Sequence, residues 1–166
     1  KGSEDINKNS IFNLLENTSK NQTIIMPTTN SAYGGGQGGV ECDENSPLNP
    51  ISKYALDKVE IEKKIMDREN TISLRLATVF GMSPRMRFDL LVNDFVRRAY
   101  LDRFIVLFES HFKRNYIHVK DVANCFEHCL ENFSQMKTNI YNVGLSDANL
   151  SKKELCERIK KYKPDF

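Results

Sequence analysis

The sequence has no long apolar run and no strong excess of charge of either sign. No stretch approaches the roughly 20 apolar residues that a membrane-spanning helix requires, and the N-terminus has no signal-peptide pattern. Lysine and arginine number 24 against 22 acidic residues, so the net charge is only +2. A nucleic-acid-binding protein would carry a clear basic excess. We therefore expect a protein of the cytoplasm with neither a membrane nor a nucleic acid as partner.

Cysteine is scarce and forms no metal-binding pattern. The four cysteines are Cys42, Cys125, Cys129 and Cys156, and no two of them form a C-x-x-C pair. Cys125 and Cys129 are four apart, which puts them on one face of an expected helix as small buried side chains. Because no second Cys/His pair stands at ligand spacing, we expect no metal site.

A phosphate-binding loop is also missing, although one run of residues is as rich in glycine as such a loop. Residues 34–39 read Gly-Gly-Gly-Gln-Gly-Gly. The run lacks the Lys-Ser/Thr of a P-loop, and a polar, acidic stretch follows it instead of an apolar helix start. We interpret residues 34–50 as a loop that covers a bound ligand.

The segments that are present predict an α/β fold. The chain has 166 residues, 40% of them hydrophobic, which is enough for a sizeable core. Apolar runs at 23–27, 71–81 and 140–144 are typical of buried parallel strands, and a helical pattern at 53–68 joins the first two into a βαβ unit. The other predicted elements are a helix around 11–15, a helix at 88–101, a strand at 104–108, an extended segment at 114–119, a helix at 121–133 and a last helix opened by a capping box at Ser151–Glu154.

The start of the helix at 53–68 carries a pair of residues suited to acid/base chemistry. Ser52 is a plausible N-cap after a proline-rich turn. Tyr54 and Lys58 lie four apart, so they occupy one face of the helix. An ammonium beside a phenol lowers the phenol pKa and makes a proton donor and acceptor useful near neutral pH. A solvated helix face is the alternative interpretation of the same pair.

Six short motifs follow one another along the chain. They are Asn7 with Asn13–Glu16, Met26–Gly34, Pro47–Lys58, Leu74–Gly81, Arg114–Asp121 and Tyr141–Gly144. In this order they resemble the extended short-chain dehydrogenase/reductase family, the NAD-dependent epimerase/dehydratase enzymes that act on nucleotide sugars. The resemblance spans nearly all of the chain.

The resemblance implies a partial Rossmann-like parallel sheet with helices on its faces, plus part of a smaller substrate-binding region. Residues 1–82 would be the C-terminal half of the NAD(P)-binding domain with its Tyr/Lys helix. Residues 83–166 would be mainly substrate-binding, with 114–133 returning to the Rossmann side.

The resemblance also implies catalytic roles for three residues. Tyr54 would be the general acid/base, and Lys58 would lower its pKa and bind the nicotinamide ribose. Thr29 would hydrogen-bond the reacting oxygen and hold it within reach of Tyr54.

Further residues take supporting roles by the same resemblance. Phe80 and Pro84 would lie near the cofactor and the substrate loop, Asn7 would shape the active site, and His118 would be structural. Arg114 would pair with the substrate diphosphate, a task suited to a guanidinium fork. The expected substrate contacts are Asn30, Ser31, Thr78, Arg87 and Arg114.

Departures from the family pattern narrow the reaction. Sugar dehydratases carry Asp-Glu after the catalytic threonine, where this chain has Asn30 and Ser31, so dehydration is disfavoured. Thr78 replaces an asparagine found in many relatives, and Asn115 replaces an aspartate. The expected function is a nucleotide-sugar epimerase or ketoreductase, with a dehydratase or decarboxylase, or a non-catalytic binding protein of the same fold, as alternatives.

The family's opening strand and G-x-x-G-x-x-G turn, which seat the cofactor pyrophosphate, have no counterpart here. We therefore expect an internal piece of a longer enzyme that is inactive alone, with NAD or NADP as cofactor and its main pyrophosphate site outside this chain. The expected partners are a nucleoside-diphosphate sugar and a second copy. The copies would pair through the Tyr54/Lys58 helix, whose second apolar stripe is Ala55, Val59 and Met66.

Overall fold

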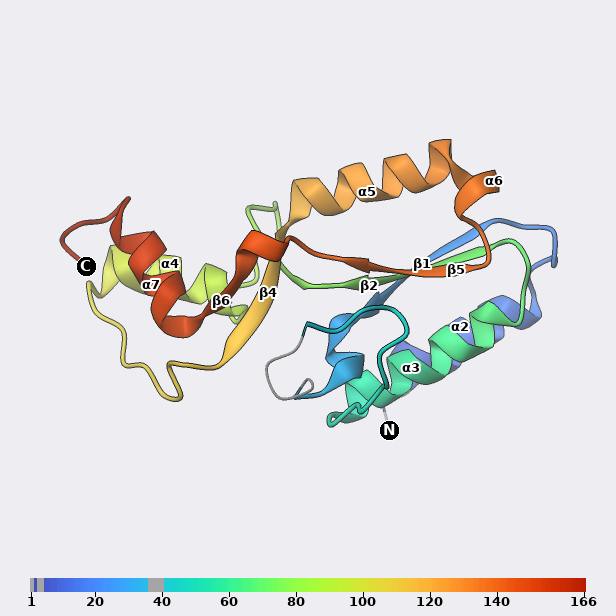
Figure 1. Ribbon diagram of the computed structural model, residues 1–166, viewed down its shortest axis with the longest axis horizontal. Coiled ribbons are helices and arrows are strands. Elements are labelled where there is room, and N and C mark those ends of the chain that lie inside the picture. The colour runs from blue at the N-terminus through green and yellow to red at the C-terminus, as the bar shows by residue number, and fades with distance from the viewer. Residues whose placement is uncertain (1, 3–4, 36–40) are drawn as a thin grey trace. The chain divides into compact units, whose positions relative to one another are not determined.

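The computed structural model describes residue 2, residues 5–35 and residues 41–166. Most of the glycine-rich run at 34–39, and with it the predicted ligand-covering role, lies outside these residues. The chain divides into two compact units (Figure 1). The first comprises Lys1–Ala77 with Ala123–Val143, and the second comprises Thr78–Val122 with Gly144–Phe166.

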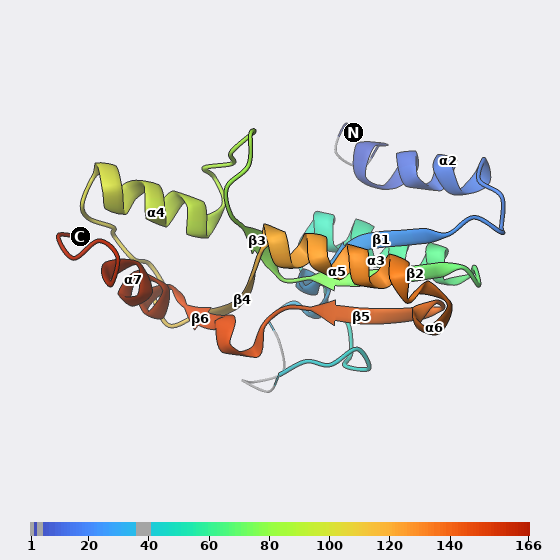
Figure 2. The same ribbon diagram turned by 90° about the horizontal axis from the view of Figure 1, so that it is seen from above.

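The first unit is built on a parallel sheet. Its strands are β1 (Ile24–Thr29), β2 (Thr71–Leu76) and β5 (Asn139–Val143), in the order β1-β2-β5. Thr29 lies opposite Leu76 and Leu76 opposite Val143, so all three strands end at the same edge. Helix α3 (Lys53–Met66) lies on one face of this sheet, and the part of α5 (Val119–Glu131) that belongs to the unit lies on the other (Figures 1 and 2). The predicted α/β fold is confirmed.

The composition of the strands explains their places in the sheet. The first five residues of β2 are buried, as expected of a central strand with a layer on each face. Pro27 lies within β1, and among the described residues β1 pairs only with β2. Proline has no N–H to donate, so it is tolerated in a strand that is paired on one side only.

The helices of the first unit pack through a small apolar cluster. Fully buried Ile61 and Ile65 of α3 meet Leu15 of α2 (Ser10–Glu16), which follows the short π-helix η1 (Asp5–Asn9). Ser52 caps α3 as predicted, since its Oγ accepts the N–H of Ala55 at 3.2 Å. The helix ends two residues before the predicted Arg68, whose guanidinium instead donates to the carbonyl of Leu15 at 3.1 Å.

The apolar stripe predicted to meet a second copy is occupied inside the chain. Ala55 is 1% exposed and Val59 is 7% exposed. These side chains are therefore unavailable to another molecule, and their assignment to a dimer surface was wrong. A dimer formed through another face of α3 remains a prediction.

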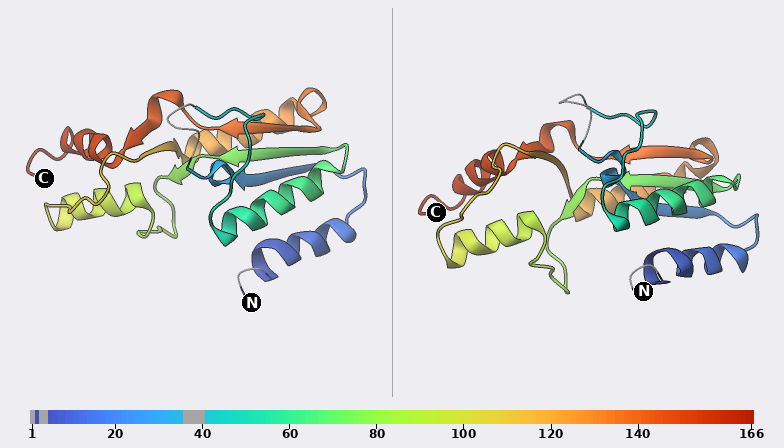
Figure 3. Two further views of the ribbon diagram at one scale, coloured as in Figure 1. Left: turned by 60° about the horizontal axis from the view of Figure 1, so that its bottom comes forward. Right: turned by 90° about the horizontal axis from the view of Figure 1, so that it is seen from below.

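The second unit combines a small mixed sheet with two helices. Strand β3 (Thr78–Phe80) runs parallel to β4 (Lys113–His118), which runs antiparallel to β6 (Asn149–Ser151). Helices α4 (Leu91–Leu101) and α7 (Lys152–Lys160) pack side by side (Figure 3). The buried residues that form this core are Val92, Phe95, Ala99, Tyr116, Leu155 and Ile159. The remaining short elements are η3 (Ser146–Ala148) in this unit and η2 (Asn30–Tyr33) and α6 (Phe133–Met136) in the first unit.

Two strand predictions need correction. The single strand predicted at 71–81 is two strands in two sheets, because Ala77 donates its N–H to Val143 at 2.8 Å and the next residues pair with β4 instead. The strand predicted at 104–108 does not form. Its odd-numbered residues Ile105 and Leu107 pack on the core, while Phe104, Val106 and Phe108 are exposed and no strand lies beside them within the described residues.

Two helix boundaries also differ from the prediction. The helix expected from residue 88 begins at Leu91, because Leu90 has an extended backbone. The helix expected from Asp121 begins at Val119 and ends at Glu131. Helix ends are set by backbone geometry and caps, which apolar periodicity does not record.

Replacing Ile61 by alanine should destabilise the first unit by about 2–5 kcal/mol, because a fully buried side chain between α2 and α3 is lost. Leu56→Ala, on the same helix but 42% exposed, should cost less than about 0.5 kcal/mol. Urea unfolding followed by circular dichroism measures both. Equal losses for the two variants would contradict the described core.

The capping box of α7 makes a second prediction. Glu154 accepts the N–H of Ser151 at 2.7 Å, and hydrogen bonds from the backbone and then the side chain of Ser151 hold the pKa of Glu154 below its ordinary 4.5. Because the folded pKa is the lower one, the stabilisation is present above pH 4.5 and is lost as the pH falls through the lowered value.

Glu154→Gln should therefore lower Tm at neutral pH, and its difference from wild type should shrink in acid. Glu157→Gln, the same change on the same helix outside the capping box, serves as the control. Thermal unfolding across an acid titration measures this. A difference between wild type and Glu154→Gln that persists unchanged into acid would contradict the capping assignment.

Candidate active site

Thr29 lies at the carboxyl end of β1 with a defined hydrogen-bonding role. It is 8% exposed, and its Oγ1 accepts the N–H of Ser31 at 3.1 Å, which makes it the N-cap of η2. Half-buried Asn30 and exposed Ser31 are the first residues of that turn. Since the Thr29 oxygen accepts from the backbone, its own proton can be donated to another oxygen.

Lys58 reaches the same end of β1 from helix α3. Its Nζ donates to the carbonyl of Pro27 at 3.2 Å, two residues before Thr29, and burial lowers the pKa of this half-buried lysine. Tyr54 lies one turn earlier and is 46% exposed, with Lys58 Nζ 5.9 Å from its ring centroid. The structure thus brings Thr29 and Lys58 to one strand end, with Tyr54 on the adjacent turn of α3.

Asn7 belongs to the same unit but to a different element. It lies half-buried in η1, which packs against α3. An ion pair of 2.5 Å between Lys8 and Glu60 joins the two elements. Asn7 is therefore placed on the segment that supports the helix of Tyr54.

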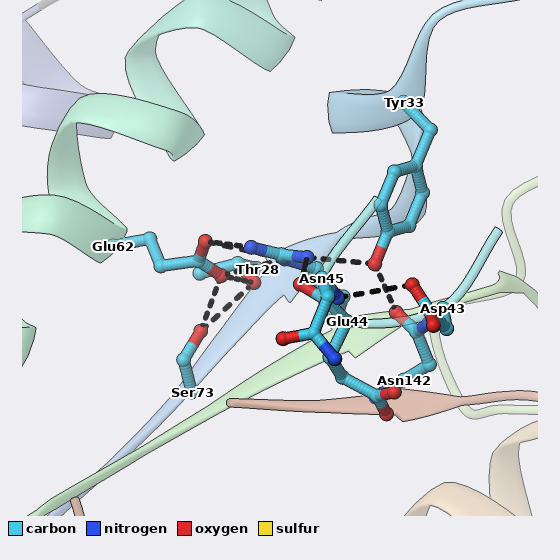
Figure 4. Close-up of polar contacts among 9 residues, drawn as sticks. Thr28, Tyr33, Asp43, Glu44, Asn45, Glu62, Ser73 and Asn142 are labelled. Atoms are coloured by element: carbon cyan, nitrogen blue, oxygen red, sulfur yellow. Dashed lines mark hydrogen bonds and ion pairs between the residues drawn. The ribbon is translucent and has the colours of Figure 1, made fainter. Parts of the chain in front are cut away.

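A buried carboxylate links α3 to the strands that carry these residues. Glu62 is 4% exposed and lies one turn after Lys58. Its Oε2 accepts from the Thr28 hydroxyl at 3.1 Å and from the Ser73 hydroxyl at 2.7 Å (Figure 4). Arg75 of β2 adds a two-pronged contact, in which Nη2 lies 2.6 Å from Oε1 and Nε lies 3.1 Å from Oε2.

The same arginine extends the network to the turn after Thr29. Nη1 of Arg75 donates to the Tyr33 hydroxyl at 2.7 Å, and that hydroxyl donates to Oδ1 of Asn142 at 2.7 Å (Figure 4). Glu44, in the loop between this turn and α3, accepts the Asn142 N–H at 2.6 Å. Burial alone would lower the pKa of Arg75, but the hydrogen bonds to Glu62 and Tyr33 outweigh it and the pKa is raised.

Sequence reasoning assigned no role to Tyr33, Glu62 or Asn142, and placed Arg75 only within a motif. Two signals could have found the pair at the centre. Arg75 is a charge between Leu74 and Leu76 in an apolar strand, and Glu62 lies one turn after Lys58 on a packing face. Buried charges of opposite sign on neighbouring elements must pair, because an unpaired one is too costly.

Phe80 and Thr78 belong to the second unit. Phe80 ends β3 and meets His118 at the end of β4 edge to face, with ring centroids 5.4 Å apart. Both rings line an apolar cavity of 480 Å³ together with Met86, Phe88 and other residues of the second unit. That size falls in the range of small-molecule sites. Thr78 is half-buried at the start of β3.

The two predicted substrate-binding arginines also lie in the second unit. Arg114 is exposed on β4. Arg87 is exposed in the loop before α4, where its Nη2 contacts Oδ2 of Asp89 at 2.5 Å. Neither side chain lines the apolar cavity, so the structure does not gather the predicted substrate residues of this unit around it.

Potential metal-ligating side chains are not clustered in the described residues. Within them, no group of three or more His, Cys, Asp or Glu side chains could hold a metal ion. All four cysteines are free, and burial, with a smaller effect of neighbouring Cys125, raises the pKa of the Cys129 thiol to about 11. In the same part of the chain, no helix combines the length and apolar character needed to cross a bilayer.

Solved structures share this fold. The dTDP-glucose 4,6-dehydratase of Bacillus anthracis, solved with NAD, gives a TM-score of 0.83 at 20% identity, covering 97% of this chain and 53% of that one. The UDP-glucose 4-epimerase of Thermus thermophilus, also solved with NAD, gives 0.80 at 24% identity, covering 97% and 55%. The chain therefore spans about half the length of these proteins.

Sequence comparison points the same way. A Bacillus subtilis protein named as an uncharacterised UDP-glucose epimerase, YtcB, is 28% identical over 106 residues, which cover 60% of this chain and 32% of that protein. The family model of the NAD dependent epimerase/dehydratase family matches residues 4–144, most of the sequence. The resemblance drawn from the six motifs is confirmed, and the chain belongs to the NAD dependent epimerase/dehydratase family.

Proposed function

We propose that this chain carries the acid/base groups of an NAD(P)-dependent nucleotide-sugar epimerase or reductase. One observation carries the proposal: the Lys58 ammonium is hydrogen-bonded to Pro27 near the end of β1, two residues before buried Thr29, and Lys58 lies one helical turn from Tyr54. A cation, a hydroxyl donor and a phenol at one sheet edge can move a proton to and from a sugar oxygen.

Each of the three side chains has a distinct task in this proposal. The Thr29 hydroxyl, whose oxygen already accepts the Ser31 N–H, donates its proton to the reacting oxygen and orients it. Tyr54 exchanges the proton with that oxygen. Half-buried Lys58 places a positive charge near the phenol, with Nζ 5.9 Å from the ring centroid of Tyr54.

The residues fit a nicotinamide cofactor, which when bound supplies the hydride acceptor that sugar oxidation requires. An ammonium has three donors, and Lys58 gives one to Pro27, which leaves two for ribose hydroxyls. Tyr54 and Phe80 would contact the cofactor as well. Either NAD or NADP meets these requirements.

Residues 83–166, most of which belong to the second unit, would provide most of the substrate side. Arg114 would pair with the diphosphate, while Arg87, Thr78, Asn30 and Ser31 would contact the sugar nucleotide. Asn7 would support the site through η1. The Bacillus subtilis protein described above, 28% identical over 106 residues, is named as a UDP-glucose epimerase, which supports this substrate class.

A dehydratase is the second candidate, and the side chains after Thr29 disfavour it. Dehydration needs an acid and a base beside the reacting carbons. Asn30 and Ser31 stand in those places and neither titrates near neutral pH. Similarity to a dehydratase at 20% identity reflects the fold alone.

Tyr54→Phe should reduce turnover by about 100- to 10,000-fold while cofactor stays bound, because only the transferable proton is removed. The assay uses the whole protein with NAD and either UDP-glucose or dTDP-glucose, followed by product chromatography. Tyr162→Phe, a tyrosine that is 85% exposed, is the matched control. Near-normal turnover by Tyr54→Phe would refute the acid/base assignment.

Arg114→Ala should raise KM for the nucleotide sugar about tenfold or more, because two charge-assisted hydrogen bonds to the diphosphate are lost. Cofactor retention should not change. Lys113→Ala removes the same charge from the adjacent residue of β4, whose side chain points to the other face. Steady-state kinetics measure both variants. Equal KM values in the two would contradict the assignment of Arg114 to the diphosphate.

A further inference from the structure

We propose that Tyr33 is a positioning residue that fixes the Thr29 hydroxyl for catalysis. The inference rests on the proposed function and concerns the same site. Tyr33 contacts no reacting atom in this proposal. It acts through the turn η2, which begins directly after Thr29 and ends at Tyr33.

The direction of the Thr29 hydroxyl depends on η2. Thr29 Oγ1 accepts the N–H of Ser31, so the direction of the hydroxyl follows the placement of that amide. The turn is a 3-10 helix of four residues. Such a short element has few hydrogen bonds of its own, so surrounding contacts decide where its amides point.

The turn η2 is held by contacts with the following loop and with the sheet. At its C-terminal end, Gly34 has φ of 65°, and a Cβ there would stand 2.1 Å from the carbonyl oxygen of Asn49. The Asn49 N–H donates to Ala32 at 2.9 Å. These contacts fix the turn to the following loop. The Tyr33 side chain, 8% exposed, supplies its link to the sheet.

Tyr33 is hydrogen-bonded to two strands of the sheet. Its hydroxyl accepts from Arg75 on β2 and donates to Asn142 on β5, both at 2.7 Å. Arg75 is 3% exposed and is itself held by Glu62, one turn after Lys58 on α3. The phenol therefore links the turn after Thr29, through Arg75, to Glu62 of α3, the helix that also carries Tyr54 and Lys58. Figure 4 shows the contacts of Tyr33 and Glu62.

Glu62 also holds the strand residue on the other side of Thr29. The neighbouring Thr28 hydroxyl donates to Glu62 at 3.1 Å, so Thr29 lies between two links to one carboxylate. Loss of the Tyr33 hydroxyl should remove only the link that runs through η2 and leave the link through Thr28 in place. We therefore expect a moderate fall in rate and not a loss of the fold.

Tyr33→Phe in the whole protein, assayed with NAD and UDP-glucose or dTDP-glucose, should lower kcat about tenfold, because small misplacements of a catalytic group are costly. KM for the nucleotide sugar should stay within about twofold. Tyr141→Phe removes the same atom in the same unit, where the hydroxyl donates to Met136 at 3.2 Å. The control should keep wild-type kcat, and an equal fall in both variants would overturn the proposal.

A double-mutant cycle tests whether Tyr33 acts through Thr29. In a Thr29→Ala background, Tyr33→Phe should have no further effect on kcat, since the hydroxyl to be positioned is gone. Independent, multiplicative losses would overturn the proposal. If Thr29→Ala alone leaves turnover unchanged, the role of Thr29 in the proposed function fails instead.

Amide hydrogen exchange gives a readout that needs no substrate. The Ser31 amide, bonded to Thr29 Oγ1, should exchange about tenfold faster in Tyr33→Phe and at the wild-type rate in Tyr141→Phe. Unchanged exchange in Tyr33→Phe would overturn the positioning link, even if neither sugar nucleotide is turned over. Faster exchange with wild-type kcat would overturn its catalytic consequence.

Discussion

The first unit depends on the hydrogen bonds that the buried carboxylate of Glu62 accepts. This carboxylate is the common acceptor for Thr28, Ser73 and Arg75, which come from two neighbouring strands, while Glu62 itself lies on the helix above them. Two buried charges are tolerated there because they pair with each other and both accept or donate further hydrogen bonds. Removal of either partner would leave an uncompensated buried charge, a loss of about 3–5 kcal/mol. The geometry of the proposed site is thus tied to the stability of the fold.

The parallel sheet brings the proposed catalytic residues of the first unit to one edge. All three strands of the first unit end at one edge, where chemistry in α/β proteins is commonly located. Helix α3 reaches that edge through Lys58, and Thr29 forms it. The second unit contributes a different surface, with an apolar cavity beside Phe80 and exposed Arg114 on β4. In our proposal the first unit holds the reacting groups and the second holds most of the substrate.

Features set by neighbouring residues could be predicted from the sequence. The Ser52 cap, the capping box at Ser151 and the βαβ order all follow from local patterns and agree with the structure. The division of residues 71–81 between two sheets could not be predicted, because the partner strands lie far along the chain. Thr29, Tyr54 and Lys58 were found from motifs, whereas the donors around Glu62 come from separate segments that only the fold unites. The catalytic roles remain predictions.

In our proposal, Thr29 and Tyr54 act on one substrate oxygen. A crystal structure of the whole protein with NAD and UDP-glucose tests it most directly. We expect the Thr29 hydroxyl and the Tyr54 phenol within hydrogen-bonding distance of the same sugar oxygen, with Lys58 Nζ bonded to the nicotinamide ribose. Thr29 and Tyr54 side chains that face different parts of the substrate, or a sugar bound away from the end of β1, would contradict it.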